Sequence, residues 1–258
     1  MLFRSLQYWR GKRTKFIAFT EAYHGDTVGA MSVGGIRLFH EAFRPLTFNV
    51  LRAGTTGELK ALLSNEIAGV CIEPLIQGAA GMRVWPRGML REVRHLCRDT
   101  LLIADEVMTG FGRTGTMFAC EKEDVVPDLM ALAKGLTGGY LPLAATMASA
   151  KVFDAFMDGT FFHGHSFTGN QLGCAAALAN LEIFEEERTL ENLKPKIEML
   201  KSYLGKFPVS RQCGFIGAVE VEQGGAKVCR ELRARGVLTR HIGNVIVIMP
   251  PYASRKNN

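Results

Sequence analysis

Two charged residues of the sequence each end a short apolar run. Residues 101–105 read Leu-Leu-Ile-Ala-Asp, and Lys134, 29 positions after Asp105, closes the run Leu-Met-Ala-Leu-Ala. A short apolar run that ends in a charge is typical of a buried central strand of an α/β sheet, which delivers a side chain to the site beyond its carboxyl end. Asp105 and Lys134 are therefore predicted to project from neighbouring strands into one site.

A buried carboxylate beside a buried amine indicates pyridoxal phosphate chemistry. The carboxylate of Asp105 would keep the pyridine nitrogen protonated, so that the ring can accept electrons, and Lys134 would hold the aldehyde as a Schiff base. Taken singly, Asp105 would more often be a helix cap or a turn residue, and Lys134 a surface residue. Together they need partners, because a buried unpaired charge is costly, and the pyridinium nitrogen and the imine supply those partners.

The segment 110–115 reads Gly-Phe-Gly-Arg-Thr-Gly and matches a dinucleotide-binding fingerprint, but its context is wrong. That fingerprint needs its first glycine directly after a strand and an acidic residue about 20 positions further on. Here residues 105–109 intervene, and no Asp or Glu occurs from Leu129 to Phe153. The sequence therefore argues against a nicotinamide site.

The composition is that of an ordinary globular protein, with 258 residues, 47% of them hydrophobic, and a net charge of +6. The basic residues are not interleaved with aromatic ones, so no nucleic-acid partner is expected. Six scattered cysteines without a Cys-x-x-Cys pair favour a reducing, cytoplasmic location. Neither a signal peptide nor an apolar run of membrane-spanning length is visible, so no membrane partner is expected.

Alternating short strands and helices predict an α/β fold with a mostly parallel, doubly wound sheet. Strands are predicted at 15–19 and 69–73 and in the runs that end at Asp105 and Lys134; helices are predicted at 2–10, 59–63 and 89–98. Residues 170–207 have a helical pattern, with Pro195 in the first turn of a second helix. A large domain is thus expected over residues 1–207.

A smaller α+β domain is expected over residues 208–258, because the pattern changes after Pro208. Strands are predicted at 215–221, around Leu238 and at 245–249, with a helix at 226–235 that Gly236 ends. The run stops without the closing helix that such a sheet would need for cover.

Five longer strings carry a family resemblance. They read AYHGDTVGAMSVGG at 22–35, EPLIQGAAGM at 73–82, LLIADEVMTGFGRTGTMFACE at 101–121, PDLMALAKGLTGGYLPLAAT at 127–146 and HGHSFTGNQLGCAAA at 163–177. Over about residues 5–252 the chain resembles the class III aminotransferases of fold type I, which depend on pyridoxal 5'-phosphate. The Tyr-His-Gly-Asp-Thr and Met-Pro-Pro-Tyr blocks resemble one branch, the adenosylmethionine-8-amino-7-oxononanoate (7,8-diaminononanoate) aminotransferases of biotin synthesis.

The resemblance implies a role for four residues around the cofactor ring. Lys134 matches the Schiff-base lysine, which also moves a proton between substrate and cofactor. Asp105 matches the carboxylate that pairs with the pyridine nitrogen. Val107, expected to point the same way in a continuing strand, matches the residue packed on one face of the ring. Tyr23 matches the aromatic residue on the other side, which touches cofactor and substrate.

Further residues are implied at the edges of the site. Gln77 resembles the glutamine near the phenolic oxygen of the cofactor, and Glu73 resembles a supporting carboxylate. Arg240 matches the arginine that holds the substrate carboxylate, a task suited to a planar bidentate donor. Val247 stands where some members have a tyrosine.

The resemblance also implies a homodimer with a shared active site. Gly164, His165 and Ser166 stand where the family has a Gly-Pro-Thr segment that reaches the phosphate and substrate of the neighbouring subunit. Ser166 keeps a hydroxyl donor, whereas His165 in place of proline is a departure that affects the rigidity of the loop.

The reaction implied by the resemblance is transamination of 8-amino-7-oxononanoate to 7,8-diaminononanoate, with S-adenosylmethionine, or alternatively lysine, as amino donor. The resemblance places the turn that cradles the cofactor phosphate upstream of residue 1, and a further stretch after Tyr252, which predicts a fragment of a longer enzyme. Two alternatives stay open: another class III aminotransferase, of the 4-aminobutyrate, ornithine or ω-amino acid type, and a non-catalytic truncated remnant.

Overall fold

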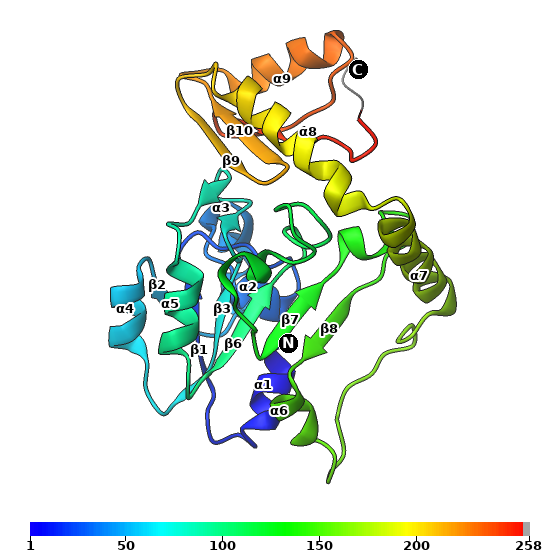
Figure 1. The fold of residues 1–258 in the computed structure, drawn as a ribbon. Coiled ribbons are helices and arrows are strands. Elements are labelled where there is room, and N and C mark those ends of the chain that lie inside the picture. The colour runs from blue at the N-terminus through cyan, green and yellow to red at the C-terminus, as the bar shows by residue number, and fades with distance from the viewer. Residues whose placement is uncertain (255–258) are drawn as a thin grey trace.

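The computed structural model of the chain describes residues 1–254, and its centre is a six-stranded sheet (Figure 1). The strands are β1 (Lys15–Phe19), β2 (Leu51–Ala53), β3 (Ile67–Ile72), β6 (Leu101–Asp105), β7 (Leu129–Leu132) and β8 (Ala145–Ala148), in the order β2-β1-β3-β6-β7-β8. All neighbouring pairs are parallel except β7 and β8. This arrangement confirms the predicted α/β fold, with β6 and β7 as neighbours.

Helices cover both faces of this sheet. They are α1 (Leu2–Tyr8), α2 (Val28–Val33), α3 (Arg37–His40), α4 (Thr56–Leu62), α5 (Met89–Leu96), α6 (Ala150–Asp154) and α7 (Gln171–Glu186), with 3-10 turns η1 (Glu41–Leu46), η2 (Ala119–Glu123) and η3 (Lys134–Thr137) and a small hairpin, β4 (Ile76–Gln77) and β5 (Arg83–Val84). Strand β1 shows the alternation: Ile17 and Phe19 pack with α4 and α5, whereas Phe16 and Ala18 pack on the face of α1. Within residues 1–254, no helix has the length and apolar character needed to cross a bilayer.

The C-terminal part forms a second sheet, at the top of Figure 1. This part of the chain contains two helices and four strands, namely α8 (Thr189–Leu204), β9 (Ser210–Cys213), β10 (Ile216–Glu220), α9 (Gly225–Ala234), β11 (His241–Ile242) and β12 (Val245–Ile248). The four strands form an antiparallel sheet in the order β11-β12-β10-β9. Since this sheet begins at Ser210, it is compatible with a domain boundary between residues 207 and 208, which stays a prediction.

Two predicted details of this part are wrong. Pro195 lies well inside α8, because the helix already begins at Thr189 after a two-residue connection in which Arg188 adopts a left-handed φ of 50°. The strand expected around Leu238 is absent from the described chain; Leu238 is 81% exposed, and the neighbouring strand is the two-residue β11. The local sequence pattern alone does not show whether an apolar residue such as Leu238 lies in a strand or in an exposed loop.

Candidate active site

A cavity of about 1160 Å³ opens where β1, β3, β6 and β7 end. Tyr23 and His24 follow β1, Glu73 follows β3, Asp105 ends β6 and Lys134 follows β7, and all five line this cavity. The carboxyl ends of parallel strands are the usual place for a ligand site in open α/β sheets. The structure therefore brings Asp105 and Lys134 into one site, as their positions in the sequence predict.

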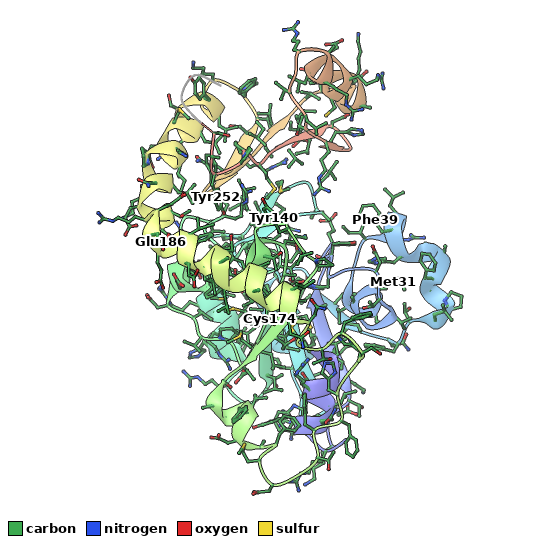
Figure 2. The ribbon with its side chains drawn as sticks, turned by 90° about the vertical axis from the view of Figure 1, so that its right-hand side faces the viewer. Met31, Phe39, Tyr140, Cys174, Glu186 and Tyr252 are labelled. Atoms are coloured by element: carbon green, nitrogen blue, oxygen red, sulfur yellow. The ribbon has the colours of Figure 1, made fainter. Side chains whose placement is uncertain are left out.

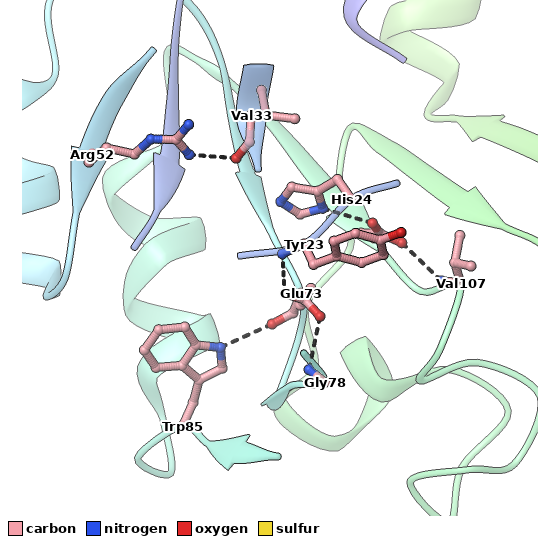
Figure 3. Close-up of polar contacts among 9 residues, drawn as sticks. Tyr23, His24, Val33, Arg52, Glu73, Gly78, Trp85 and Val107 are labelled. Carbon is pink, nitrogen blue, oxygen red and sulfur yellow. Dashed lines mark hydrogen bonds and ion pairs between the residues drawn. The ribbon is translucent and has the colours of Figure 1, made fainter. Parts of the chain in front are cut away.

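Asp105 forms a buried ion pair with His24, which the sequence analysis did not single out (Figure 3). Its Oδ2 lies 2.7 Å from His24 Nδ1, and its Oδ1 accepts a hydrogen bond of 3.1 Å from the backbone N–H of Val107. Burial by itself lowers the pKa of His24, but the hydrogen bond and the charge of Asp105 outweigh it, so the pKa of His24 is raised. The contact with His24 and the N–H of Val107 fixes the direction of the Asp105 carboxylate.

Glu73 accepts hydrogen bonds from two loops that line the cavity, those of Tyr23 and Gly78 (Figure 3). Its two carboxylate oxygens accept hydrogen bonds of 3.1 Å from the N–H of Tyr23 and 3.0 Å from the N–H of Gly78. Burial raises the pKa of Glu73 to about 7. These hydrogen bonds hold the loops of Tyr23 and Gly78 in place, whereas the supporting role of Glu73 toward the cofactor stays a prediction.

Tyr23 and Val107 both line the cavity. The Tyr23 hydroxyl donates a 2.9 Å hydrogen bond to Asp26, and burial together with this bond raises the pKa of Tyr23, whereas the charge of Arg240 lowers it in part. The continuing strand predicted through Val107 is wrong: β6 ends at Asp105, and Val107 lies in a turn. Its N–H contact with Asp105 nevertheless keeps it beside the carboxylate.

Lys134 differs from its prediction in two respects. Strand β7 ends at Leu132, so Lys134 begins the turn η3 with a left-handed φ of 48°, and its side chain is exposed to the cavity instead of buried. No hydrogen bond or ion pair of its amine forms within residues 1–254. An amine that opens into a cavity can attack an electrophile such as an aldehyde.

The other predicted residues lie in different places. Arg240 lines the same cavity from the C-terminal part of the chain. Gln77 is fully buried and does not line the cavity, and its amide donates a 2.9 Å hydrogen bond to the Thr20 carbonyl. Met108 is among the residues that line the cavity. Gly164, His165 and Ser166 form an exposed loop that does not line the cavity of its own chain.

Glu106, next to Asp105, organises the loop that follows β6. Its carboxylate is fully buried and accepts hydrogen bonds from the hydroxyl of Thr109 at 2.5 Å and from the N–H groups of Ala119 at 2.9 Å and Cys120 at 2.8 Å. Burial raises the pKa of Glu106, and these three donors oppose that shift.

We expect Glu106→Gln to destabilise the chain by about 3 kcal/mol, since the NH2 group that replaces one carboxylate oxygen cannot accept a hydrogen bond and leaves a buried N–H group of Ala119 or Cys120 without an acceptor. Urea unfolding at pH 8 measures this change, with the exposed Glu185→Gln as matched control. Equal unfolding midpoints for the two variants would contradict the role assigned to Glu106.

The residues in this cavity fit the ring and the aldehyde of pyridoxal phosphate. The carboxyl group of Asp105, fixed in direction by His24, suits a protonated ring nitrogen, and Tyr23 and Val107 can flank a planar ring. The amine of Lys134, without a partner of its own in the described chain, suits the aldehyde.

A mostly parallel α/β sheet that brings the carboxyl group of Asp105 and the open amine of Lys134 to one cavity indicates a pyridoxal-phosphate-dependent class of enzyme. The family Aminotransferase class-III matches residues 2–258, and the chain belongs to this family. This finding confirms the resemblance on which the expected fold type and cofactor rest.

Particular relatives are enzymes named adenosylmethionine-8-amino-7-oxononanoate aminotransferase. That of Geobacter sulfurreducens is 48% identical over 96% of this chain and 67% of its own length, and that of Nitratidesulfovibrio vulgaris is 46% identical over 93% of this chain and 53% of its own. The crystal structure of the Methanocaldococcus jannaschii enzyme has a TM-score of 0.93 and 40% identity, over 99% of this chain and 68% of that one. The chain thus spans 53–68% of the length of these relatives.

Proposed function

We propose that the site transfers an amino group to 8-amino-7-oxononanoate, with pyridoxal 5'-phosphate as cofactor, and so forms 7,8-diaminononanoate in biotin synthesis. The observation that carries this proposal is that Asp105, Lys134 and Arg240 line one cavity. The names of the relatives at 44–48% identity support the choice of substrate.

The chain's own residues divide the work of this reaction. When bound, pyridoxal phosphate supplies a ring that takes up the electron pair left at the substrate carbon. Asp105, whose carboxylate is fixed in direction by His24, would hold a proton at the ring nitrogen. Lys134 would hold the cofactor through Nζ and, once released as a free amine, would move a proton from the substrate carbon to the cofactor carbon that carried the aldehyde.

The outer part of the cavity suits an acid with a long apolar chain. Its wall contains apolar side chains beside the guanidinium of Arg240, contributed by Leu38, Phe39, Phe43 and Ile242. Phe39, seen with Met31 on the α2–α3 segment in Figure 2, packs edge-on against Tyr23 with ring centroids 5.7 Å apart. Arg240 can bind a carboxylate while these side chains contact methylene groups.

Three finer features belong to the same proposal. S-adenosylmethionine as amino donor is supported by the names of the relatives. A homodimer is supported by exposed apolar residues along the segment that includes the 164–166 loop, namely Phe153, Met157, Phe161, Phe162, Phe167, Leu172, Leu178 and Ile183. A cytoplasmic location is supported by six free cysteines.

The function is tested by incubating the chain with cofactor, 8-amino-7-oxononanoate and S-adenosylmethionine, and separately with 4-aminobutyrate and 2-oxoglutarate. Lysine replaces S-adenosylmethionine in a third reaction. Formation of 7,8-diaminononanoate in the first or third mixture, and no transfer in the second, is the expected result. Transfer from 4-aminobutyrate alone would place the chain with the other class III activities and refute the proposed substrate.

Arg240→Leu should raise the KM for 8-amino-7-oxononanoate about 30- to 300-fold and change kcat much less, since a charge-assisted bidentate contact to the substrate is lost. Steady-state kinetics with varied 8-amino-7-oxononanoate measures both constants. The matched control is Arg230→Leu on α9, because Arg230 is also exposed but lies outside the cavity. The same rise in KM for both variants, or for neither, would contradict the assignment of Arg240.

A further inference from the structure

The turn that carries Lys134 has an unfavourable backbone conformation. Lys134 has a φ of 48°, and Gly138, at the other end of η3, has a φ of 61°. A residue with a Cβ rarely adopts the left-handed region and does so at a cost of about 1 kcal/mol. The amine itself has no protein partner within residues 1–254, so neighbouring groups must hold the turn.

Asn180 of α7 contacts this turn directly. Its side-chain Nδ2 donates hydrogen bonds to the carbonyl oxygens of Gly135 at 2.9 Å and Leu136 at 3.3 Å. Its Oδ1 lies only 2.9 Å from the point that a Cβ on Gly138 would occupy, so the amide fits against the end of the turn. Figure 2 shows α7 between Cys174 and Glu186, the helix that presents this side chain.

Phe111 packs closely against the same turn at Gly135. A Cβ on Gly135 would come within 2.9 Å of the Phe111 Cβ, so the absence of a side chain at Gly135 permits this close packing. The main chain of Phe111 is fixed by two hydrogen bonds of 2.6 Å, from its N–H to the Met117 carbonyl and from the Tyr252 hydroxyl to its own carbonyl. The turn is therefore held between a rigid aromatic residue and the amide of Asn180.

We propose that Asn180 is a positioning residue for Lys134: its amide holds the carbonyl groups of η3 and thereby directs the amine into the cavity. This inference rests on the proposed function, in which Lys134 binds the cofactor. Asn180 does not line the cavity and touches neither Asp105 nor Tyr23, so its effect on the site passes through the turn alone.

The test uses Asn180→Asp, which keeps the shape but removes the donor, and Asn180→Ala, which removes the side chain. Asn192→Asp and Asn192→Ala are matched controls, because Asn192 of α8 does not line the cavity and its Nδ2 donates a 2.6 Å hydrogen bond to the carbonyl of Glu187, the residue that follows α7. Hydrogen–deuterium exchange is measured on the cofactor-free chain. The amides of Leu136 and Gly138 report the turn, since both are hydrogen-bonded within it, and α5 reports the rest of the fold.

Loss of the Asn180 contact should accelerate exchange of the turn amides about five- to tenfold, with α5 unchanged. In the cofactor-loaded chain, the pH midpoint of the visible absorbance band should shift and kcat should fall more than KM changes. The positioning role would be overturned if both Asn180 variants kept the wild-type exchange rates of the turn amides and the wild-type pH midpoint of the absorbance band. If the wild-type band at the same time depends on Lys134, the proposed function stays intact. Absence of any Lys134-dependent band in the wild type would overturn both.

Discussion

Replacing Lys134 with alanine is expected to reduce amino transfer by at least about a thousandfold, because one residue performs two tasks. The amine anchors the cofactor, and it moves the proton at the substrate carbon; a positioned acid–base group by itself contributes about 100- to 10,000-fold. Loss of the visible absorbance band of the bound cofactor should accompany the loss of activity. Both are measured on the purified chain after incubation with pyridoxal phosphate.

The stability of the Lys134→Ala variant should stay close to that of the wild type, since the exposed amine forms no hydrogen bond or ion pair within the described chain. Alanine keeps the same left-handed backbone requirement, so the strain of the turn is unchanged. Lys151→Ala, an exposed lysine on α6, serves as control and should retain band and activity. A Lys134→Ala variant with normal transfer would refute the assignment of this residue.

Asp105→Asn is expected to reduce amino transfer about 100- to 1000-fold and to destabilise the chain by about 3 kcal/mol. The loss of activity follows because a neutral amide cannot hold the ring nitrogen protonated. The loss of stability follows because His24, whose side chain is only 4% exposed, loses the charge of its ion-pair partner. Steady-state kinetics and thermal unfolding measure the two effects, with the exposed Asp99→Asn as control.

The pH dependence of stability separates this explanation from a general weakening of the fold. In the wild type the pKa of His24 is raised above 6.5, so its stabilising contribution is present below pH 6.5 and is lost as the pH rises through the raised pKa. In Asp105→Asn the charge of Asp105 is removed, so we expect burial to lower the pKa of His24. The variant should then lose stability as the pH falls through this lowered pKa. Between pH 5 and 8 the Tm difference between wild type and variant should therefore narrow as the pH rises. A constant difference would contradict the His24–Asp105 pair.

The features that could be predicted from the sequence are those encoded by local pattern. Strand β1 has the predicted bounds, 15–19, and the run that ends at Asp105 is β6, because a continuous apolar run between polar segments has few other places in an α/β fold. The convergence of Asp105 and Lys134 followed from a general rule on parallel sheets, and β6 and β7 are indeed neighbours.

The features that could not be predicted depend on contacts between distant parts of the chain. His24 and Asp105 are 81 residues apart, and nothing in the Tyr-His-Gly-Asp-Thr block indicates that the imidazole faces a carboxylate instead of solvent. The exposure of Lys134 depends on where β7 ends, and strand ends are set by pairing with β8 and by the packing of Phe111 on Gly135. A signal was nevertheless available, since a histidine next to a site tyrosine is a candidate partner for a buried acid.

The proposed function depends above all on covalent binding of pyridoxal phosphate by Lys134 within this cavity. The most direct measurement is to incubate the chain with the cofactor, reduce the mixture with borohydride and map the modified peptides by mass spectrometry. We predict a single stoichiometric addition on the peptide that contains Lys134. This modification should be reduced in Asp105→Asn and absent in Lys134→Ala. An unmodified Lys134 peptide, or equal modification of several exposed lysines, would contradict the claim.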